Sequence, residues 1–189
     1  MFIHKLKIMK INKELVKFGK PLGVTKQKVV SFSNHGKSKN KDQPNYYNNV
    51  YSGVKYQSVE FVRRWLITVY GITFESVDDA TDIFKLKNFI LVKYPSIKIV
   101  IEKCVNNGSK NIAFGNVIIW DSQGAFNVDG SCAIVVKVKN NIIYIADQNV
   151  SNKSWNDKCY SRKLYVNENN VIEDREYPDT KITGWLKYN

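Results

Sequence analysis

The side chain best placed for chemistry is the hydroxyl of Ser58, which follows a long polar loop and stands where a predicted helix begins. A nucleophile at a helix N-terminus is favoured by the positive end of the helix dipole, which also stabilises the oxyanion formed by attack. A histidine on a neighbouring strand would act as the base, and an acid or amide on the next strand would orient it. The order of loop, helix and strands therefore suggests a triad-type nucleophilic site as one hypothesis.

Histidine, the usual base, is scarce, since only His4 and His35 occur. His35 lies in the loop before the helix and could reach Ser58. Because that loop is rich in lysine, we expect His35 to be an exposed turn residue instead.

Cysteines and acidic residues give no metal-binding pattern. The three cysteines form an odd set without CxxC spacing, which argues against a disulfide framework and against zinc. Three aspartates near a predicted helix start, Asp78, Asp79 and Asp82, are interpreted as helix-capping charge. We therefore expect no metal ion and no cofactor.

The strongest element that could position the site is a helix over residues 58–70. Apolar side chains recur there at helical spacing, Ser58 stands at the N-cap position, and Gly71 ends the helix. A second helix is expected from Ser76, because Ser76 and Asp79 resemble a capping box.

The rest of the chain predicts loops and strands. Residues 1–20 could form a short helix, and residues 34–53 are polar and turn-rich, so a long loop is expected there. A tight turn is expected at residues 140–141. Strands are predicted at 28–32, 97–101, 117–120, 132–138, 142–146, 164–166 and 182–186. Helices followed by antiparallel strands indicate an α+β domain with N-terminal helices packed on a mostly antiparallel sheet.

Five segments in order along the chain resemble the CHAP amidase family, most of all its glutathionylspermidine amidase domain. Residues 51–65, YSGVKYQSVEFVRRW, are similar to the family pattern Y-x-G-x-K-W-Q-C-V-E-F-A-R-R. The other segments are GNVIIWD at 115–121, DGSCAIV at 129–135, IADQNV at 145–150 and DTKITGW at 179–185. The resemblance covers about residues 18–188 and implies a papain-like α+β fold with an amidase site.

The same resemblance shows departures at the reacting positions. The family's catalytic Cys corresponds to Ser58, its catalytic His to Ser131, and its acidic residue to Asp147. A serine hydroxyl needs a base to attack an amide, and serine at the base position cannot accept a proton near pH 7. In a model triad enzyme, loss of nucleophile or base alone costs on the order of a million-fold. The two changes favour a pseudoenzyme in which these three residues are vestigial triad positions.

Cys132 directly follows Ser131. Adjacent residues of a strand point to opposite faces, so the Cys132 thiol is expected to face away from the site. We interpret Cys132 as a buried core residue rather than a nucleophile.

The resemblance also implies substrate-binding residues at four positions. Gln57 would help to shape the oxyanion site, although it could equally be an ordinary polar residue before the helix. Arg64 would contact a substrate carboxylate if the cleft is retained, or form an internal salt bridge to Glu60 or Asp147 if it is not. The full set is Gln57, Arg64, Gln148 and Asn149.

The chain has 189 residues, and its formal net charge of +12 is concentrated near the N-terminus. Residues 1–42 carry eleven Lys against Glu14 and Asp42, a balance of +9. Such a segment could make weak contacts with nucleic acid, an anionic lipid surface or an acidic protein, or could be a solvated lead-in. We expect a basic arm at 1–17 and an amidase-like domain at 18–189.

The overall composition excludes several classes. Hydrophobic residues make up 43%, which is ordinary for a globular protein and unlike a disordered or collagen-like chain. No apolar run approaches the ~18–20 residues of a membrane span, and no signal peptide is recognisable. We therefore expect a cytoplasmic protein, or a virion protein if the Lys- and Asn-rich composition reflects an AT-rich viral genome.

The leading hypothesis is a catalytically degenerate amidase-like protein with a binding or structural role. Its expected ligand is a small peptide or a polyamine conjugate. One alternative is an active amidase that hydrolyses glutathionylspermidine or a peptidoglycan-like amide bond. A second is a basic, nucleic-acid-associated structural protein, for instance of a virus particle.

Overall fold

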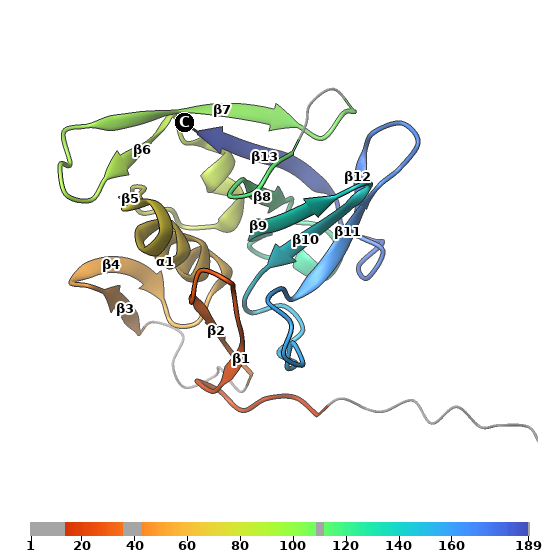
Figure 1. The fold of residues 1–189 in the computed structure, drawn as a ribbon, viewed down its shortest axis with the longest axis horizontal. Coiled ribbons are helices and arrows are strands. Elements are labelled where there is room, and N and C mark those ends of the chain that lie inside the picture. Colours follow the sequence, from red (N-terminus) through yellow and green to blue (C-terminus); the bar gives the residue numbers. More distant parts are fainter. Residues whose placement is uncertain (1–13, 36–42, 109–111, 189) are drawn as a thin grey trace, which may run out of the picture.

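A nine-stranded sheet forms the centre of the molecule (Figure 1). In this computed structural model the described residues are 14–35, 43–108 and 112–188. Every strand pair within these ranges is antiparallel. In spatial order the strands are β12 (Ile172–Glu173), β11 (Arg162–Val166), β10 (Ile142–Ala146), β9 (Ser131–Lys139), β8 (Val117–Trp120), β13 (Ile182–Tyr188), β7 (Lys98–Val105), β6 (Asn88–Leu91) and β5 (Ile72–Thr73).

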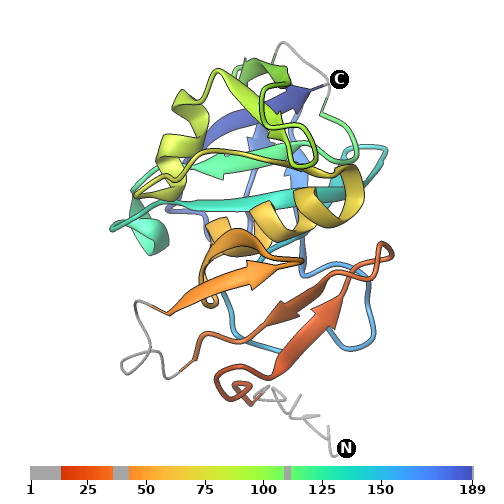
Figure 2. The same ribbon diagram turned by 90° about the vertical axis from the view of Figure 1, so that its left-hand side faces the viewer.

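The other described elements are two hairpins and short helices. Two hairpins pair β1 (Pro21–Val24) with β2 (Val30–Phe32), and β3 (Pro44–Tyr47) with β4 (Val50–Val54). Figure 2 shows the α-helix, α1 (Ser58–Tyr70), between the large sheet and these two hairpins. The described residues also form two short 3₁₀ helices, η2 (Ala80–Lys85) and η3 (Gly124–Phe126).

Helix α1 is held by its apolar face. Phe61, Val62, Trp65 and Leu66 are all completely buried. Burial of each such side chain contributes about 1.5–3 kcal/mol, which fixes the helix against the sheet. Gly71 ends the helix in the left-handed conformation at φ +64, which glycine adopts without strain.

The alternation of side chains divides the core into two layers. Along β8 and β9, every second side chain packs under α1. The side chains between them pack in a second hydrophobic cluster on the opposite face of the sheet. The set under α1 is Val117, Ile119, Cys132 and Ile134. The opposite set is Ile118, Trp120, Ala133 and Val135.

The sheet and the main helix are confirmed. The helix has the predicted bounds, as do the strands at 117–120 and 142–146, and the other predicted strands are present with shifted ends. Asn140 has φ +51 in the turn between β9 and β10, as expected for a tight hairpin. The fold is therefore α+β in a β-rich form.

Two expectations about local structure are wrong. The predicted second helix is only the six-residue 3₁₀ helix η2. Its N-cap is Asp79, which forms a capping box with Asp82, so the helix begins three residues after the predicted cap at Ser76. The short helix that residues 1–20 could form falls largely on residues 1–13, which lie outside the described residues, and residues 14–20 are not helical. The expected loop at 34–53 contains the β3–β4 hairpin, whose turn residues Asn48 and Asn49 both have positive φ.

The N-terminal arm stays a prediction. Residues 1–13 and 36–42 lie outside the described residues, and with them His4 and most of the lysines of the basic segment. Val16 donates a backbone hydrogen bond to the carbonyl of Asn152, so the chain is already attached to the domain within the expected arm. None of the described helices is long and apolar enough to cross a membrane.

Candidate functional site

Ser58 is the first residue of α1, and residues 55–57 connect it to the end of β4. Gln57 is the N-cap residue, and its side chain makes no capping hydrogen bond. The N–H groups of the first helical turn therefore remain available to an acceptor. At Gly53 (φ +133) a Cβ atom would lie 3.0 Å from the Cα of Glu60, so β4 passes the helix start closely because residue 53 is glycine.

A cavity of about 260 Å³ opens beside Ser58, and we call it the Ser58 cavity. Ser131, at the start of β9, lines it together with Ser58. Gln57 and Asn149 also line it, and the Asn149 amide donates to Gln57 Oε1 at 2.6 Å. Four of the seven predicted site residues therefore meet at one cavity.

Two exposed carboxylates, Asp78 and Asp129, lie in the wall of the Ser58 cavity and form what we call its acidic rim. Desolvation and then the charges of Asp129, Asp82 and Asp78 raise the pKa of nearby Asp79. Negative charge therefore gathers at this side of the cavity. Asp79 and Asp82 cap η2, as the capping interpretation predicted.

Arg63 also lines the Ser58 cavity, whereas the sequence favoured Arg64. Its guanidinium donates to the carbonyls of Ser52 at 3.2 Å and Glu75 at 3.0 Å. Burial lowers the pKa of Arg63, and its Nε has no hydrogen-bond partner among the described residues. Arg63 and Arg64 both belong to the predicted motif. They differ in where their side chains point, since only Arg63 lines the cavity.

The Cys132 thiol faces Ser58, and the expectation that it faces away is wrong. Cys132 lies on the sheet face that α1 covers, so the first residue of α1 meets it. Burial raises the pKa of Cys132 to about 12, although a hydrogen bond from Ser58 acts in the opposite direction. The thiol is completely buried and protonated at neutral pH, as a core residue should be.

Thiol titration tests this placement. At pH 8 we expect one fast-reacting thiol in the native protein, Cys159, which is partly exposed. Cys132, with its pKa about four units above that pH, and buried Cys104 should react only after denaturation. A Cys159→Ser variant should then show no fast thiol. Fast labelling of Cys132 in that variant would contradict the buried arrangement.

Asp147 does not line the Ser58 cavity. Its Oδ2 accepts a hydrogen bond from Arg162 Nε at 2.6 Å, and Arg162 Nη1 also contacts Asp174. All three side chains are nearly completely buried. Burial lowers the pKa of Arg162, but the two carboxylates outweigh it, so the net shift is upward. The residue at the orienting-acid position is thus part of a buried charge cluster.

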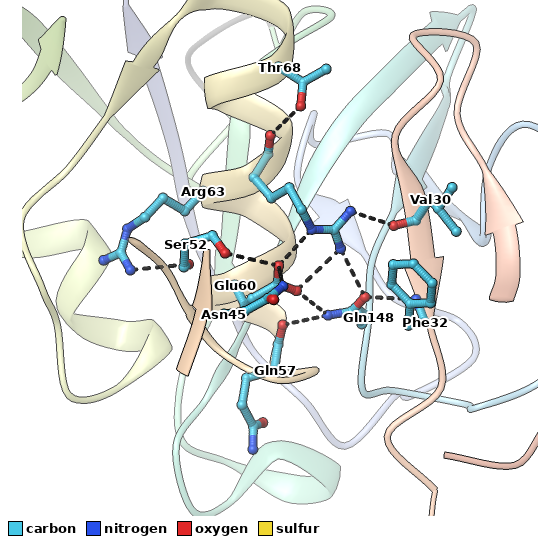
Figure 3. Close-up of polar contacts among 10 residues, drawn as sticks. Val30, Phe32, Asn45, Ser52, Gln57, Glu60, Arg63, Thr68 and Gln148 are labelled. Carbon is cyan, nitrogen blue, oxygen red and sulfur yellow. Dashed lines mark hydrogen bonds and ion pairs between the residues drawn. The ribbon is translucent and has the colours of Figure 1, made fainter. Parts of the chain in front are cut away.

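Behind the helix start lies a second buried network, centred on Glu60 (Figure 3). Arg64 donates to both carboxylate oxygens of Glu60, with Nε at 2.6 Å from Oε1 and Nη2 at 3.2 Å from Oε2. Asn45 and Ser52 of the β3–β4 hairpin donate to Oε1 as well. The network therefore ties α1 to that hairpin.

Gln148 joins the same network to the rest of the site. Its amide nitrogen donates to Glu60 Oε2 at 2.8 Å and to the Gln57 carbonyl at 3.0 Å. Its carbonyl accepts from the Phe32 N–H, and Arg64 donates to the Val30 carbonyl. Of the two arrangements predicted for Arg64, the structure has the internal ion pair with Glu60.

The predicted site residues thus divide between two places. Ser58, Ser131, Gln57 and Asn149 line the cavity, whereas Arg64, Gln148 and Asp147 lie in buried networks. His35 is exposed, as expected, and is not among the residues lining the cavity. Within the described ranges no group of three His, Cys, Asp or Glu side chains could hold a metal ion.

The residues around the Ser58 cavity offer several groups that can bind a ligand. Uncapped helical N–H groups and Arg63 can receive a carbonyl or carboxylate oxygen, and the acidic rim can receive a cation. Among the described residues that line the cavity there is no histidine, so none offers an imidazole base to the Ser58 hydroxyl.

Comparison with known proteins gives the family relationship. The chain is 33% identical over 144 residues to the bifunctional glutathionylspermidine synthetase/amidase of Escherichia coli (strain K12), which is 75% of this chain and 23% of that protein. It is 29% identical over 178 residues to the trypanothione synthetase of Crithidia fasciculata, which is 92% of this chain and 27% of that protein. The chain is a distant relative of these proteins.

The relationship is limited to part of each relative. The chain spans about a quarter of the length of the curated relatives it matches. No family model matches the chain. The predicted resemblance to glutathionylspermidine amidase is therefore confirmed at the level of distant homology, whereas the CHAP assignment and the roles of the individual site residues stay predictions.

Proposed function

We propose that the chain is a papain-like, CHAP amidase-related binding domain that holds a polyamine conjugate in the Ser58 cavity without hydrolysing it. The observation that carries the proposal is the Ser58 cavity itself, in which an uncapped helix start and an acidic rim lie together. The printed names of two relatives, a glutathionylspermidine synthetase/amidase and a trypanothione synthetase, suggest the ligand class.

The cavity chemistry matches the two ends of such a conjugate. An amide carbonyl accepts hydrogen bonds from the free N–H groups at a helix N-terminus, and a carboxylate is attracted to Arg63. A protonated amine is attracted to Asp78 and Asp129 on the acidic rim. The ligand would therefore lie across the start of α1, with its cationic end towards η2.

The lack of turnover follows from the residues around Ser58. The hydroxyl lies beside the buried, protonated Cys132 thiol, and Ser131 stands at the base position. Asp147, which would orient a base, has its carboxylate bonded to Arg162 instead. Nucleophile and base act as a unit, so an unassisted Ser58 gains little from the helix dipole alone.

Calorimetric titration with glutathionylspermidine tests the binding. We expect saturable binding that weakens about tenfold, or ~1.4 kcal/mol, in the Asp78→Asn/Asp129→Asn variant, because the amine loses both carboxylates. The exposed, charge-matched variant Asp157→Asn/Glu168→Gln should bind like the original protein. Equal weakening in both variants, or no saturable binding at all, would show the proposed ligand site to be wrong.

A hydrolysis assay separates the proposal from the active-amidase alternative. We expect no release of spermidine above the background of buffer alone over hours. The paired control is Ser58→Ala, which should bind the conjugate with similar affinity because the helix N–H groups, Arg63 and the acidic rim are unchanged. Turnover that disappears in Ser58→Ala would establish an active amidase and overturn the non-hydrolysing function.

A further inference from the structure

A second cavity, of about 490 Å³, lies beside β11 and the segment that precedes it. We call it the basic pocket. None of its lining residues belongs to the Ser58 cavity or to the segments of family resemblance. Its charged lining residues are Lys153, Lys158, Arg162, Lys163, Arg175 and Glu176.

The positive charge of this pocket is largely unbalanced. Lys153, Lys158 and Lys163 form no ion pair with any described residue. Arg175 has only a loose contact with Glu173 at 3.9 Å between two well-exposed side chains. Such a contact is weak in water, so it leaves the guanidinium available to a ligand.

Aromatic rings hold several of these cations in place. The Arg175 guanidinium lies 4.3 Å from the centroid of the Tyr165 ring, and Lys158 Nζ lies 5.7 Å from that of Tyr160. Lys163 Nζ lies 5.5 Å from the Tyr144 ring. Cation–π contacts restrict long flexible side chains, which lowers the entropy lost when they bind an anion.

Arg162 contributes a buried cation to the pocket lining. Its Nε and Nη1 are bonded to Asp147 and Asp174, which balance its charge. Its Nη2, in contrast, has no hydrogen-bond partner among the described residues. The guanidinium also lies 5.0 Å from the centroid of the Trp120 ring and 5.1 Å from that of the Tyr177 ring, so Arg162 is a fixed part of the pocket wall.

We propose that the basic pocket binds a small ligand bearing more than one phosphate charge. Several ammonium groups and a planar guanidinium around one hollow suit phosphate oxygens, which accept charge-assisted hydrogen bonds from both. The volume lies in the range of small-molecule sites. A polynucleotide would instead be expected to follow an extended groove with exposed ring faces, whereas the Tyr165 ring here is covered by Arg175.

Calorimetry with inorganic pyrophosphate at about 0.15 M salt tests the proposal. We expect one saturable site, weakened about tenfold in Lys163→Gln/Arg175→Gln. The charge-matched variant Lys87→Gln/Lys98→Gln alters exposed lysines outside the pocket lining and should retain the original affinity. All four positions are at least partly solvent-exposed, and circular dichroism will verify that both variants fold.

Two results would overturn the proposal. Equal weakening of pyrophosphate binding in the two double variants would mean that the affinity depends only on the net charge of the protein. Binding of a ten-nucleotide RNA more than tenfold tighter than pyrophosphate, with a steep salt dependence, would assign the surface to nucleic acid instead. A selective loss in Lys163→Gln/Arg175→Gln, together with weaker RNA binding, would support the small-ligand site.

Discussion

Replacement of Arg162 by Met is expected to lower the free energy of unfolding by about 3–5 kcal/mol, because it leaves two buried carboxylates without their cation. Asp147 and Asp174 both pair with this guanidinium, and Asp174 is completely buried. The methionine side chain fills much of the space of the arginine. The loss of stability therefore reflects the missing positive charge more than lost packing. Urea denaturation followed by circular dichroism measures it.

Two further variants isolate the cause. Arg175→Met makes the same substitution at an arginine whose side chain is 61% exposed, and should change the stability by less than about 0.5 kcal/mol. Asp147→Asn/Asp174→Asn in the Arg162→Met background removes the unpaired charges and should recover part of the loss. If Arg162→Met destabilises no more than Arg175→Met, the buried charge cluster does not support the fold.

The elements with strong periodicity were predictable from the sequence. The helix over 58–70 has an apolar stripe, a terminating Gly71 and no competing pattern. Strands β8 and β10 are short apolar runs with turn residues beside them. These signals are local, so tertiary contacts did not need to be known. The β3–β4 hairpin was missed because β3 is short, partly polar and at least half-exposed, although consecutive Asn48 and Asn49 are a recognisable turn signal.

The arrangement of the site was less predictable. Motif matching gave the positions of Ser58 and Ser131, which do line one cavity. It could not show that Arg63 turns towards the cavity and Arg64 away from it, because neighbouring helical positions differ by about 100° in direction. The partner of Asp147, Arg162, lies fifteen residues away on β11, and no local pattern indicates such a contact.

The prediction from strand alternation that the Cys132 thiol faces away from the site was also wrong. Alternation correctly separates Ser131 from Cys132, but it does not say which face the helix covers. The start of α1 lies over the face of Cys132, while Ser131 reaches the cavity from the end of β9. A base at position 131 would thus approach Ser58 from the rim of the cavity rather than from beneath the helix.

Glu60 is the second residue whose loss should have a large effect. Glu60→Ala is expected to lower the free energy of unfolding by about 3–5 kcal/mol, because the completely buried carboxylate accepts hydrogen bonds from Arg64, Asn45, Ser52 and Gln148. Its removal leaves the buried Arg64 cation without its counter-charge. Thermal or urea unfolding measures the effect, and Glu75→Ala, at an exposed glutamate, should change stability by less than about 0.5 kcal/mol.

The conservative variant Glu60→Gln separates stability from site geometry. The glutamine keeps the volume but has one acceptor oxygen where Glu60 offers two, so it cannot satisfy both Arg64 and Gln148. Since Gln148 also holds the Gln57 carbonyl, the start of α1 should loosen. We expect the Glu60→Gln protein, still folded at 20 °C, to bind glutathionylspermidine several-fold more weakly than the Glu75→Gln control. Unchanged affinity in Glu60→Gln would mean that this network supports the fold without shaping the Ser58 cavity.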